Sequence, residues 1–301
     1  MAYRGRFAPT PSGPLHFGSV VAALGSWLDA RAHDGEWHLR IDDLDPPRIM
    51  AGAADEILVE LERLGLTWDG PLVFQSERSA DYADALARLR KSTHVYRCDC
   101  SRKQIATAGL IGIDGPRYPG TCRDRSEVPA TGSAWRLDVR GARVRFDDLL
   151  QGATEQDLDT AGGDFVLQRA DQVYGYHLAC VIDDAHSRFT HVVRGADLLD
   201  STPRQIWLQR LLDLPTPAYL HLPVAIDARG EKLSKQTLAT PVRDTGSVEL
   251  LGRALTYLGH PPPAELIVGT RNDLLVWAIA RWQRERIPLA RARPATPGPA
   301  L

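Results

Sequence analysis

The segment PTPSGPLHFGS, residues 9–19, places His16 directly before an apolar stretch that predicts a helix. Residues 1–28 contain two arginines but no acidic side chain. Such a helix start favours anions, because its first N–H groups are unpaired and the helix dipole is positive there. Gly18 would let a ligand approach the backbone closely. The segment therefore predicts a phosphate site, and the alternative is a plain strand-to-helix turn with a surface histidine.

A second segment is notable because lysine is scarce in this sequence. Only four of the 36 Lys and Arg residues are lysines, and two of them, Lys232 and Lys235, lie in the pentapeptide KLSKQ. A lysine ammonium is a compact point charge that a planar guanidinium does not replace. Neither common nucleotide loop, G-x-x-x-x-G-K-[ST] or G-x-G-x-x-G, occurs. The lysine pair is thus the candidate for neutralising phosphate charge, and the alternative is an exposed charged turn.

Three of the four cysteines lie close together in the sequence: Cys98, Cys100 and Cys122. The N-terminal residues show no apolar segment typical of a secretory signal, and in a reducing compartment such a cluster favours a metal over disulfides. Thiolates at this spacing suit one tetrahedral Zn²⁺ per chain, with water or Asp99 as candidates for the fourth ligand. Three reduced structural thiols are the alternative. Cys180 lies in the apolar segment YHLACVI and is expected in the core.

The apolar pattern predicts an α/β scaffold for these residues. A strand around YRGRFAPT, a helix over 18–32, a strand WHLRIDDLD and helices over 54–64 and 80–91 follow one another. This alternation favours a parallel sheet with right-handed crossovers. It resumes later with HLACVIDDA, THVVRGADL and STPRQIWLQRLLDL, where Ser201 or Thr202 is expected to cap a helix.

Between the two α/β stretches lies a segment rich in glycine and proline, with two strand candidates, AWRLDVR and VRFDDLL. We interpret it as an insertion. Helices are expected near 247–258 and 272–286. The predicted organisation is the first half of a catalytic domain over 1–97, the insertion with the metal site over 98–173, the second half with KLSKQ over 174–245, and a C-terminal helical segment and tail over 246–301.

Composition limits the classes of function. Apolar residues make up 44% and charged residues 25% of the 301, as in an ordinary globular protein large enough to bury a sizeable core. No apolar run approaches the roughly 18 residues of a membrane span, so we expect no membrane partner and a cytoplasmic protein. Because the net charge is −2, an RNA partner would need a local basic patch. The arginine-rich segment 271–293 could form one, or could be a solvated helix face.

HFGS and KLSKQ together resemble the HIGH and KMSKS signatures of class I aminoacyl-tRNA synthetases, in which both loops hold the phosphates of ATP. RFAPTPSGPLHFGS and LRIDDLDPPR resemble the glutamyl branch of that class, and the resemblance extends from Arg4 to about Glu249. Only 65 residues follow KLSKQ, too few for the anticodon-binding region of the full-length glutamyl enzymes. Within the branch the chain looks closest to the short members, which attach glutamate to queuosine in the anticodon loop of tRNA(Asp), and this length supports that resemblance.

The resemblance implies a class I synthetase Rossmann-like parallel sheet with an inserted zinc-bearing subdomain and C-terminal helices. It implies ATP as a substrate, with Mg²⁺, held by His16, Gly18, Ser19, Lys232 and Lys235. Of these, His16, Lys232 and Lys235 would be catalytic, with Lys235 the stronger ATP ligand. Gln236 stands where the family has a final serine. The fourth zinc ligand that the resemblance implies is Tyr118, in YPGTC.

The resemblance also implies a site for L-glutamate. Its residues would be Arg6, Phe7, Ala8, Pro9, Thr10, Asp42, Tyr176 and Arg194. Arg6 and Arg194 would bind carboxylate, since a guanidinium can pair with it bidentately. Asp42 would hold the ammonium and Tyr176 would hydrogen-bond nearby, although the family usually has glutamate at position 42. From the residues alone, the acids of LRIDDLD could simply form a polar strand end.

The first functional hypothesis is ATP-dependent activation of glutamate to glutamyl-adenylate without tRNA, followed by transfer to queuosine in tRNA(Asp). The second is a truncated glutamyl-tRNA synthetase that charges a tRNA 3′ end. The third, from another class, is a catalytically inactive zinc-bearing RNA-binding module. Retention of both HFGS and the scarce lysines of KLSKQ argues against the third.

Overall fold

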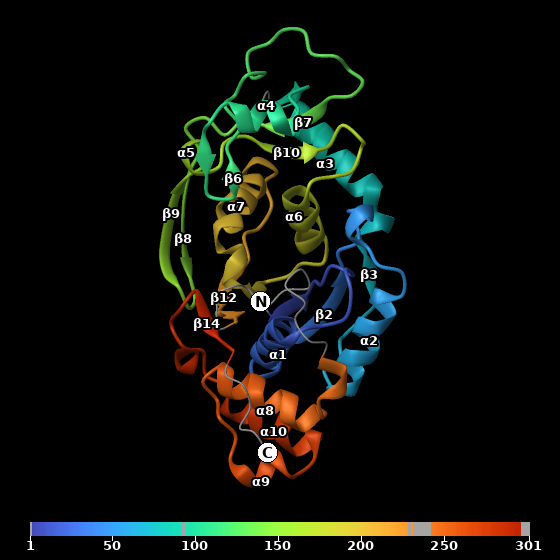
Figure 1. Ribbon diagram of the computed structural model, residues 1–301, viewed down its shortest axis with the longest axis vertical. Helices are drawn as coiled ribbons and strands as arrows, with labels where there is room; N and C mark the ends of the chain where they lie inside the picture. The colour runs from blue at the N-terminus through green and yellow to red at the C-terminus, as the bar shows by residue number, and fades with distance from the viewer. Residues whose placement is uncertain (1, 92–93, 228–229, 231–241, 296–301) are drawn as a thin grey trace.

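The computed structural model describes residues 2–91, 94–227, 230 and 242–295. Lys232, Lys235 and the rest of KLSKQ lie outside the described residues. Figure 1 shows an elongated molecule with the insertion at one end, the C-terminal helices at the other and the catalytic α/β elements between them. None of the described helices combines the length and the apolar character that a membrane crossing requires.

The first α/β stretch forms a parallel sheet in the order β1-β2-β3, from the strands Arg4–Phe7, Glu36–Ile41 and Val73–Phe74. Parallel pairing requires a crossover, which α1, Phe17–Arg31, provides between the first two strands. The helices α2, Ala53–Arg63, and α3, Ser79–Lys91, flank the third strand in the chain. The predicted helices and the parallel pairing are confirmed here.

The second stretch repeats this arrangement. Helix α6, Tyr176–His186, leads to β11, His191–Gly195, which pairs in parallel with β12, Ala218–Leu222, across helix α7, Thr202–Leu211. The two stretches meet where the backbone N–H of Thr190 donates to the carbonyl of Arg4 at 2.9 Å. The carboxyl ends of β1 and β11 therefore open at the same place.

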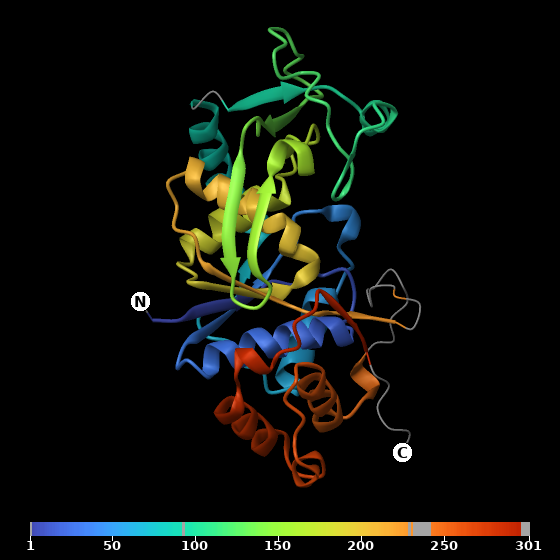
Figure 2. The same ribbon diagram turned by 90° about the vertical axis from the view of Figure 1, so that its left-hand side faces the viewer.

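The insertion is built around β7, Ala134–Leu137, which pairs antiparallel with β4, Val95–Cys98, on one side and β10, Phe165–Gln168, on the other. Its remaining elements are α4 Arg102–Thr107, β5 Ile111–Gly112, β6 Gly115–Pro116, β8 Arg143–Asp148, β9 Gly152–Asp157 and α5 Leu158–Ala161. Figure 2 shows the β8–β9 hairpin extending from the insertion down to the catalytic sheet. There the N–H of Leu149 donates to the carbonyl of Tyr219 in β12 at 2.9 Å.

The C-terminal segment packs against α1 and returns to the catalytic sheet. It contains α8 Ser247–Tyr257, α9 Ala264–Ile267, α10 Arg271–Arg281 and β14 Ala292–Pro294, and the last of these pairs in parallel with β13 Val224–Ile226. Short 3₁₀ turns lie at Pro46–Arg48, Gln75–Arg78, Ala196–Ser201, Val242–Asp244 and Arg284–Arg286. Because α1 is covered by the sheet and by these helices, it is apolar nearly all round, with Leu24 and Leu28 wholly buried.

Candidate active site

A cavity of about 710 Å³ lies at the carboxyl ends of β1 and β11. This is the edge of a parallel α/β sheet where ligands usually bind. Eleven of the residues expected for ATP or glutamate line this cavity: Arg6, Phe7, Ala8, Pro9, Thr10, His16, Gly18, Ser19, Asp42, Tyr176 and Arg194. The structure therefore brings together every candidate of those two sites that it describes. Sequence reasoning missed Arg48 and Asp197, two lining residues with charged side chains.

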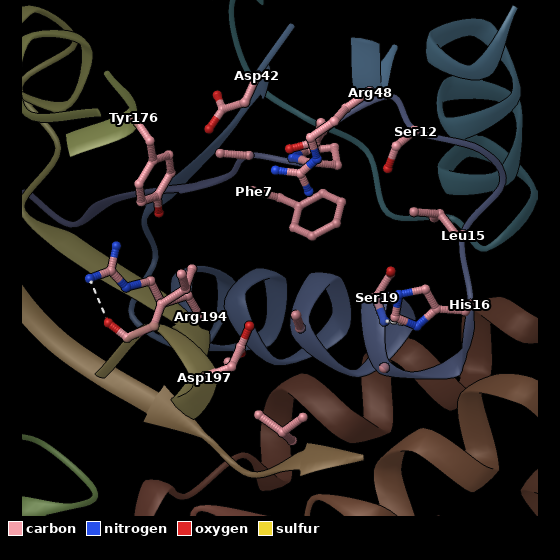
Figure 3. A pocket seen from close by; sticks show the side chains of 18 of the residues that line it. Phe7, Ser12, Leu15, His16, Ser19, Asp42, Arg48, Tyr176, Arg194 and Asp197 are labelled. Atoms are coloured by element: carbon pink, nitrogen blue, oxygen red, sulfur yellow. Dashed lines mark hydrogen bonds between the residues drawn. The ribbon is translucent and has the colours of Figure 1, made fainter. Parts of the chain in front are cut away.

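Two ends of the cavity differ in character (Figure 3). At one end lie Ser12, Leu15, His16 and Ser19, and at the other lie Tyr176 and Arg194 with Asp197 nearby. The first end belongs to the loop before α1 and the start of that helix, and the second to α6, β11 and the turn that follows β11. A ligand with an anionic group at each end would match this layout.

At the helix end, His16 caps α1. Its Nδ1 accepts a hydrogen bond from the N–H of Ser19 at 3.3 Å, so the ring proton lies on Nε2. The first turn of α1 carries no acidic side chain, as expected for an anion site. The cap nevertheless occupies the N–H of Ser19, which leaves those of Phe17 and Gly18 as the backbone donors of this turn.

At the other end, Arg194 is buried, with 5% of its surface exposed. Its Nε donates to His221 Nε2 at 3.0 Å, and its Nη2 donates to Thr202 Oγ1 at 2.8 Å and to the Leu198 carbonyl at 3.4 Å. Its Nη1 has no hydrogen-bond partner, and it forms no ion pair with any acidic residue in the described part of the chain. A buried guanidinium with an unpaired N–H at a cavity wall is a strong attractor for an anion.

Arg6 and Asp42 differ from the sequence expectation, which treated them as open to substrate groups. Arg6 already holds Asp184 through two hydrogen bonds, at 3.2 and 3.3 Å. Arg40 holds Asp42 at 2.7 Å and also reaches Asp184 at 2.7 Å. Burial raises the pKa of the Asp42 carboxyl above its usual range, and the ion pair with Arg40 opposes that effect. Both residues line the cavity, but each would meet a substrate while keeping an internal partner.

The ion pairs extend beneath the cavity floor. Asp183 accepts hydrogen bonds from Gln75, Arg78 and Tyr82, at 2.7, 2.6 and 2.8 Å. The network thus contains three arginines and three aspartates: Arg6, Arg40, Arg78, Asp42, Asp183 and Asp184. The charges of these six side chains cancel, and Arg194 belongs to none of these ion pairs. The sequence does contain a hint of this network. Two adjacent acids lie in the apolar segment HLACVIDDA, and an arginine lies within the strand of LRIDD.

The cysteine candidates also converge. The sulfur atoms of Cys98, Cys100 and Cys122 all lie within 4.8 Å of one another, with Cys100 and Cys122 only 3.6 Å apart. The hydroxyl of Tyr118 lies 3.4 Å from the sulfur of Cys98 and accepts the N–H of Cys122 at 2.8 Å. Asp99, the other candidate, lies 3.4 Å from the sulfur of Cys122. Tetrahedral zinc with bonds of about 2.3 Å sets ligand atoms roughly 3.5–3.8 Å apart, so this donor set fits the ion.

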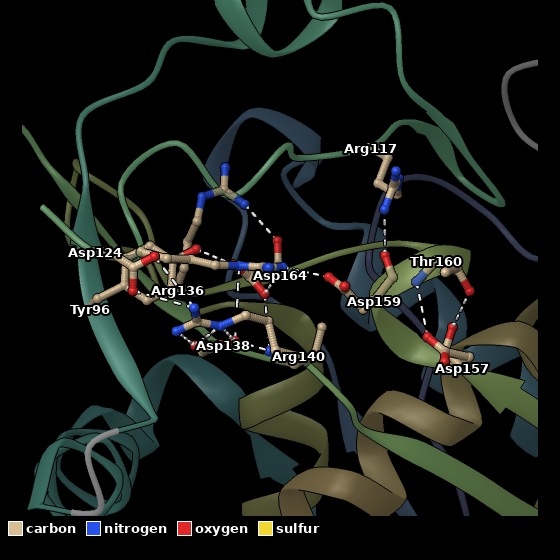
Figure 4. A network of polar contacts seen from close by, with 12 residues as sticks. Tyr96, Arg117, Asp124, Arg136, Asp138, Arg140, Asp157, Asp159, Thr160 and Asp164 are labelled. Atoms are coloured by element: carbon tan, nitrogen blue, oxygen red, sulfur yellow. Dashed lines mark hydrogen bonds and ion pairs between the residues drawn. The ribbon is translucent and has the colours of Figure 1, made fainter.

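A polar network supports the cysteine cluster (Figure 4). Its centre is Asp164, whose carboxylate accepts hydrogen bonds from Tyr96, from Arg123 and from the N–H of Val139. Arg136 donates to the Asp164 carbonyl at 2.9 Å, and its guanidinium lies 4.1 Å from the centre of the Tyr118 ring. This network ties the strands β4, β7 and β10 to the segment that carries Tyr118.

His177, the residue after Tyr176, gives a pH prediction. Burial, together with the nearby charges of Arg204 and Arg194, lowers its pKa to about 3. Between about pH 6.5 and pH 3, His177 is therefore protonated in the unfolded chain but not in the folded chain. We expect the free energy of unfolding to fall as the pH is lowered through this window, by up to about 1.4 kcal/mol per pH unit from this group.

Chemical denaturation at several pH values would measure this effect. His177→Phe keeps a ring beside Phe165 and should flatten the pH dependence relative to the original chain. His94→Gln, at an exposed position, is the control and should leave the slope as it is. Parallel pH curves for the chain with and without His177 would contradict the prediction.

Comparisons with known proteins bear on the family. Residues 2–252 match the family model described as tRNA synthetases class I (E and Q), catalytic domain. The glutamyl-Q tRNA(Asp) synthetase of Aromatoleum aromaticum is 52% identical over 286 residues, which cover 95% of this chain and 90% of that protein. The protein of the same name from Chromobacterium violaceum is 50% identical over 286 residues, covering 95% of each chain.

Solved structures agree on the fold. The glutamate-tRNA synthetase of Elizabethkingia anophelis superposes with a TM-score of 0.80 at 22% identity, over 96% of this chain and 67% of that one. A glutamate tRNA ligase from Elizabethkingia meningosepticum, in complex with its amino acid, gives 0.77 at 23% identity, over 96% and 66%. The resemblance drawn from the sequence is confirmed, as is the α/β catalytic fold that it implied. The chain belongs to the class I tRNA synthetases of the glutamyl and glutaminyl branch, a family of ligases.

Proposed function

We propose that this protein activates L-glutamate with ATP to form glutamyl-adenylate without tRNA, and then transfers the glutamyl group to queuosine in tRNA(Asp). In the first step a carboxylate oxygen of glutamate attacks the α-phosphorus of ATP, and pyrophosphate leaves. In the second step queuosine takes the glutamyl group and AMP leaves. The relatives named above support the acceptor, since they are glutamyl-Q tRNA(Asp) synthetases at 50–52% identity.

The observation that carries the proposal is the unpaired Nη1 of the buried Arg194 guanidinium. Free glutamate has two carboxylates and one ammonium, so its net charge is −1. Arg194 presents a buried positive charge with an unpaired Nη1 at the cavity wall, which can meet one of these carboxylates. A volume of about 710 Å³ lies in the range typical of small-molecule sites. Charge and size both fit an anionic amino acid with a nucleotide beside it.

Within this proposal each end of the cavity has a task. Arg194 binds the side-chain carboxylate of glutamate and Tyr176 hydrogen-bonds nearby, while Asp42 faces the ammonium from the cavity floor. Arg6 and the segment through Thr10 line the amino-acid site. At the opposite end His16, Gly18 and Ser19 hold the phosphates of ATP, bound with Mg²⁺.

Lys232 and Lys235 complete the proposed ATP site. They would neutralise the charge that develops on the phosphates as pyrophosphate leaves. In this proposal the protein accelerates the reaction by aligning bound glutamate with bound ATP and by stabilising charge in the transition state. His16 would contribute as a donor through its protonated Nε2.

The test of the proposal has two arms. Glutamate-dependent ATP–pyrophosphate exchange should proceed with no tRNA present. Transfer of labelled glutamate should then require queuosine, so tRNA(Asp) carrying queuosine should be labelled and an otherwise identical tRNA(Asp) without it should not. Removing the 3′-terminal adenosine should leave the labelling intact. Labelling that depends on the 3′ end would favour a truncated glutamyl-tRNA synthetase, and no exchange at all would favour an inactive RNA-binding module.

We also propose that Cys98, Cys100, Tyr118 and Cys122 hold one Zn²⁺ per chain. The ion would act structurally by fixing the insertion, because none of the residues proposed for ATP or glutamate lies between Cys98 and Cys122. Elemental analysis of protein purified without added metal should find one zinc per chain. Cys100→Ser should lower that content, whereas Cys180→Ser, the same change outside the cluster, should not. A folded chain that carries no metal would contradict the prediction.

A further inference from the structure

Behind Arg194 lies a buried pair that neither the sequence motifs nor the cavity lining singled out. Asp148, at the end of β8, and His221, in β12, both have side chains that are fully buried. The carboxylate Oδ2 of Asp148 lies 2.6 Å from His221 Nδ1, and His221 Nε2 lies 3.0 Å from Arg194 Nε. The three side chains form one line from the insertion hairpin to the cavity wall.

The direction of each hydrogen bond in this line is fixed. An arginine Nε always carries a proton and can only donate, so His221 Nε2 must accept, and the Thr202 hydroxyl lies 3.1 Å from the same nitrogen. The proton of a neutral His221 ring is therefore on Nδ1, where Asp148 accepts it. Burial lowers the pKa of His221 to about 4, which keeps the ring neutral near pH 7. Asp148 thereby selects the His221 tautomer whose Nε2 can accept a hydrogen bond from Arg194.

The other oxygen of Asp148 is committed to the backbone. Oδ1 accepts the N–H groups of Leu150, Gln151 and His221, at 3.0, 2.8 and 3.2 Å. The hairpin also reaches β12 through Gln151, whose amide donates to the His221 carbonyl at 2.9 Å. These bonds hold the carboxylate in one orientation, with Oδ2 facing the ring.

We propose that Asp148 and His221 are positioning residues for glutamate binding, which hold the Arg194 guanidinium with its unpaired Nη1 available to the substrate carboxylate. The inference rests on the proposed function, because it assumes that Arg194 binds glutamate. Without the acceptor at Nε2, the guanidinium would lose the contact that fixes its rotation about the side chain. Thr202 and the Leu198 carbonyl would then hold only Nη2.

Asp148→Asn tests this pairing directly. Three backbone donors require an oxygen at the Oδ1 position, so the amide nitrogen of asparagine must face His221. That nitrogen donates, which moves the ring proton from Nδ1 to Nε2. The Nε2–H can then donate only to the Thr202 hydroxyl 3.1 Å away, and Arg194 Nε–H loses its acceptor. We expect KM for glutamate in ATP–pyrophosphate exchange to rise about ten- to hundredfold, with KM for ATP nearly unchanged.

Two further measurements separate positioning from a merely structural role. Two-bond ¹H–¹⁵N correlation spectra of the histidine rings should show the proton of His221 on Nδ1 in the original chain and on Nε2 in Asp148→Asn. His221→Asn keeps a donor for Asp148 but offers no acceptor to Arg194, so it should also raise KM for glutamate. Asp157→Asn is the matched control, since this residue lies on the same hairpin and caps α5 away from the cavity.

The outcomes distinguish the inference from the function on which it rests. An unchanged tautomer in Asp148→Asn, or a changed tautomer with an unchanged KM for glutamate, would overturn the inference. If Arg194→Gln itself left KM for glutamate unchanged, the proposed role of Arg194 would fail. Thermal unfolding of each variant shows whether a raised KM belongs to a folded chain.

Discussion

Arg194→Gln is expected to raise KM for glutamate in ATP–pyrophosphate exchange by roughly a hundredfold. The substitution removes a buried positive charge of the cavity wall together with a donor that has no partner in the described structure. Hydrogen bonds from charged groups contribute about 1.5–3 kcal/mol each, and a loss of about 2.7 kcal/mol is a hundredfold change in affinity. The preference for glutamate over glutamine should narrow, because without the guanidinium the site no longer favours a carboxylate over an amide.

Two further variants show whether the rise in KM for glutamate comes from the lost Arg194 side chain. Arg194→Lys keeps a positive charge but loses the fork that reaches His221 and Thr202, so it should fall between the original chain and Arg194→Gln. Arg210→Gln, an equivalent change at an exposed position on α7, should leave exchange as it was. If Arg194→Gln activated glutamate normally, the assignment of the carboxylate site would be wrong.

Lys235→Ala is expected to reduce glutamyl-adenylate formation by about 10² to 10³, which is the usual cost of one contact to charge that develops in a transition state. Lys235→Arg should restore little, because a planar fork does not place its charge where an ammonium does. Single-turnover formation of the adenylate measures this step separately from product release. Lys91→Ala, at an exposed position on α3, is the matched control. Near-normal exchange by a folded Lys235→Ala chain would remove KLSKQ from the proposed ATP site.

The local parts of the molecule could be predicted from the sequence. Apolar periodicity predicted α1 over 18–32, one residue from its observed bounds, Phe17–Arg31. It also predicted strands on both sides of that helix, which fix where the opening loop must lie. The candidate residues of that loop then face the cavity because parallel strands end at one edge of the sheet.

The pairing of buried charges could not be predicted, because it depends on contacts between distant parts of the chain. Arg40 and Asp184 are 144 residues apart, and Arg6 and Asp184 are 178 apart. A single sequence shows that charged residues lie in apolar segments but not which of them meet. The expected roles of Arg6 and Asp42 therefore lacked the internal partners that the structure shows.

The helix cap at Ser201 or Thr202 shows the same limit on a smaller scale. Ser201 occupies the cap position of α7, but its side chain makes no capping hydrogen bond. The hydroxyl of Thr202 instead lies 2.8 Å from Arg194 and 3.3 Å from the Leu198 carbonyl. Thr202, which local sequence preferences assign to a helix end, thus forms a hydrogen bond with a residue of the cavity wall instead.

The β8–β9 hairpin limits how freely parts could be exchanged between relatives in chimeric proteins. The insertion looks like a replaceable module, since the catalytic strands precede and follow it in the chain. Its hairpin nevertheless delivers Asp148 to a histidine of β12. A donor insertion without an acid at that position would yield a chimera that folds but binds its amino acid weakly. Recombination points for such chimeras should keep Asp148 and His221 on segments from the same parent.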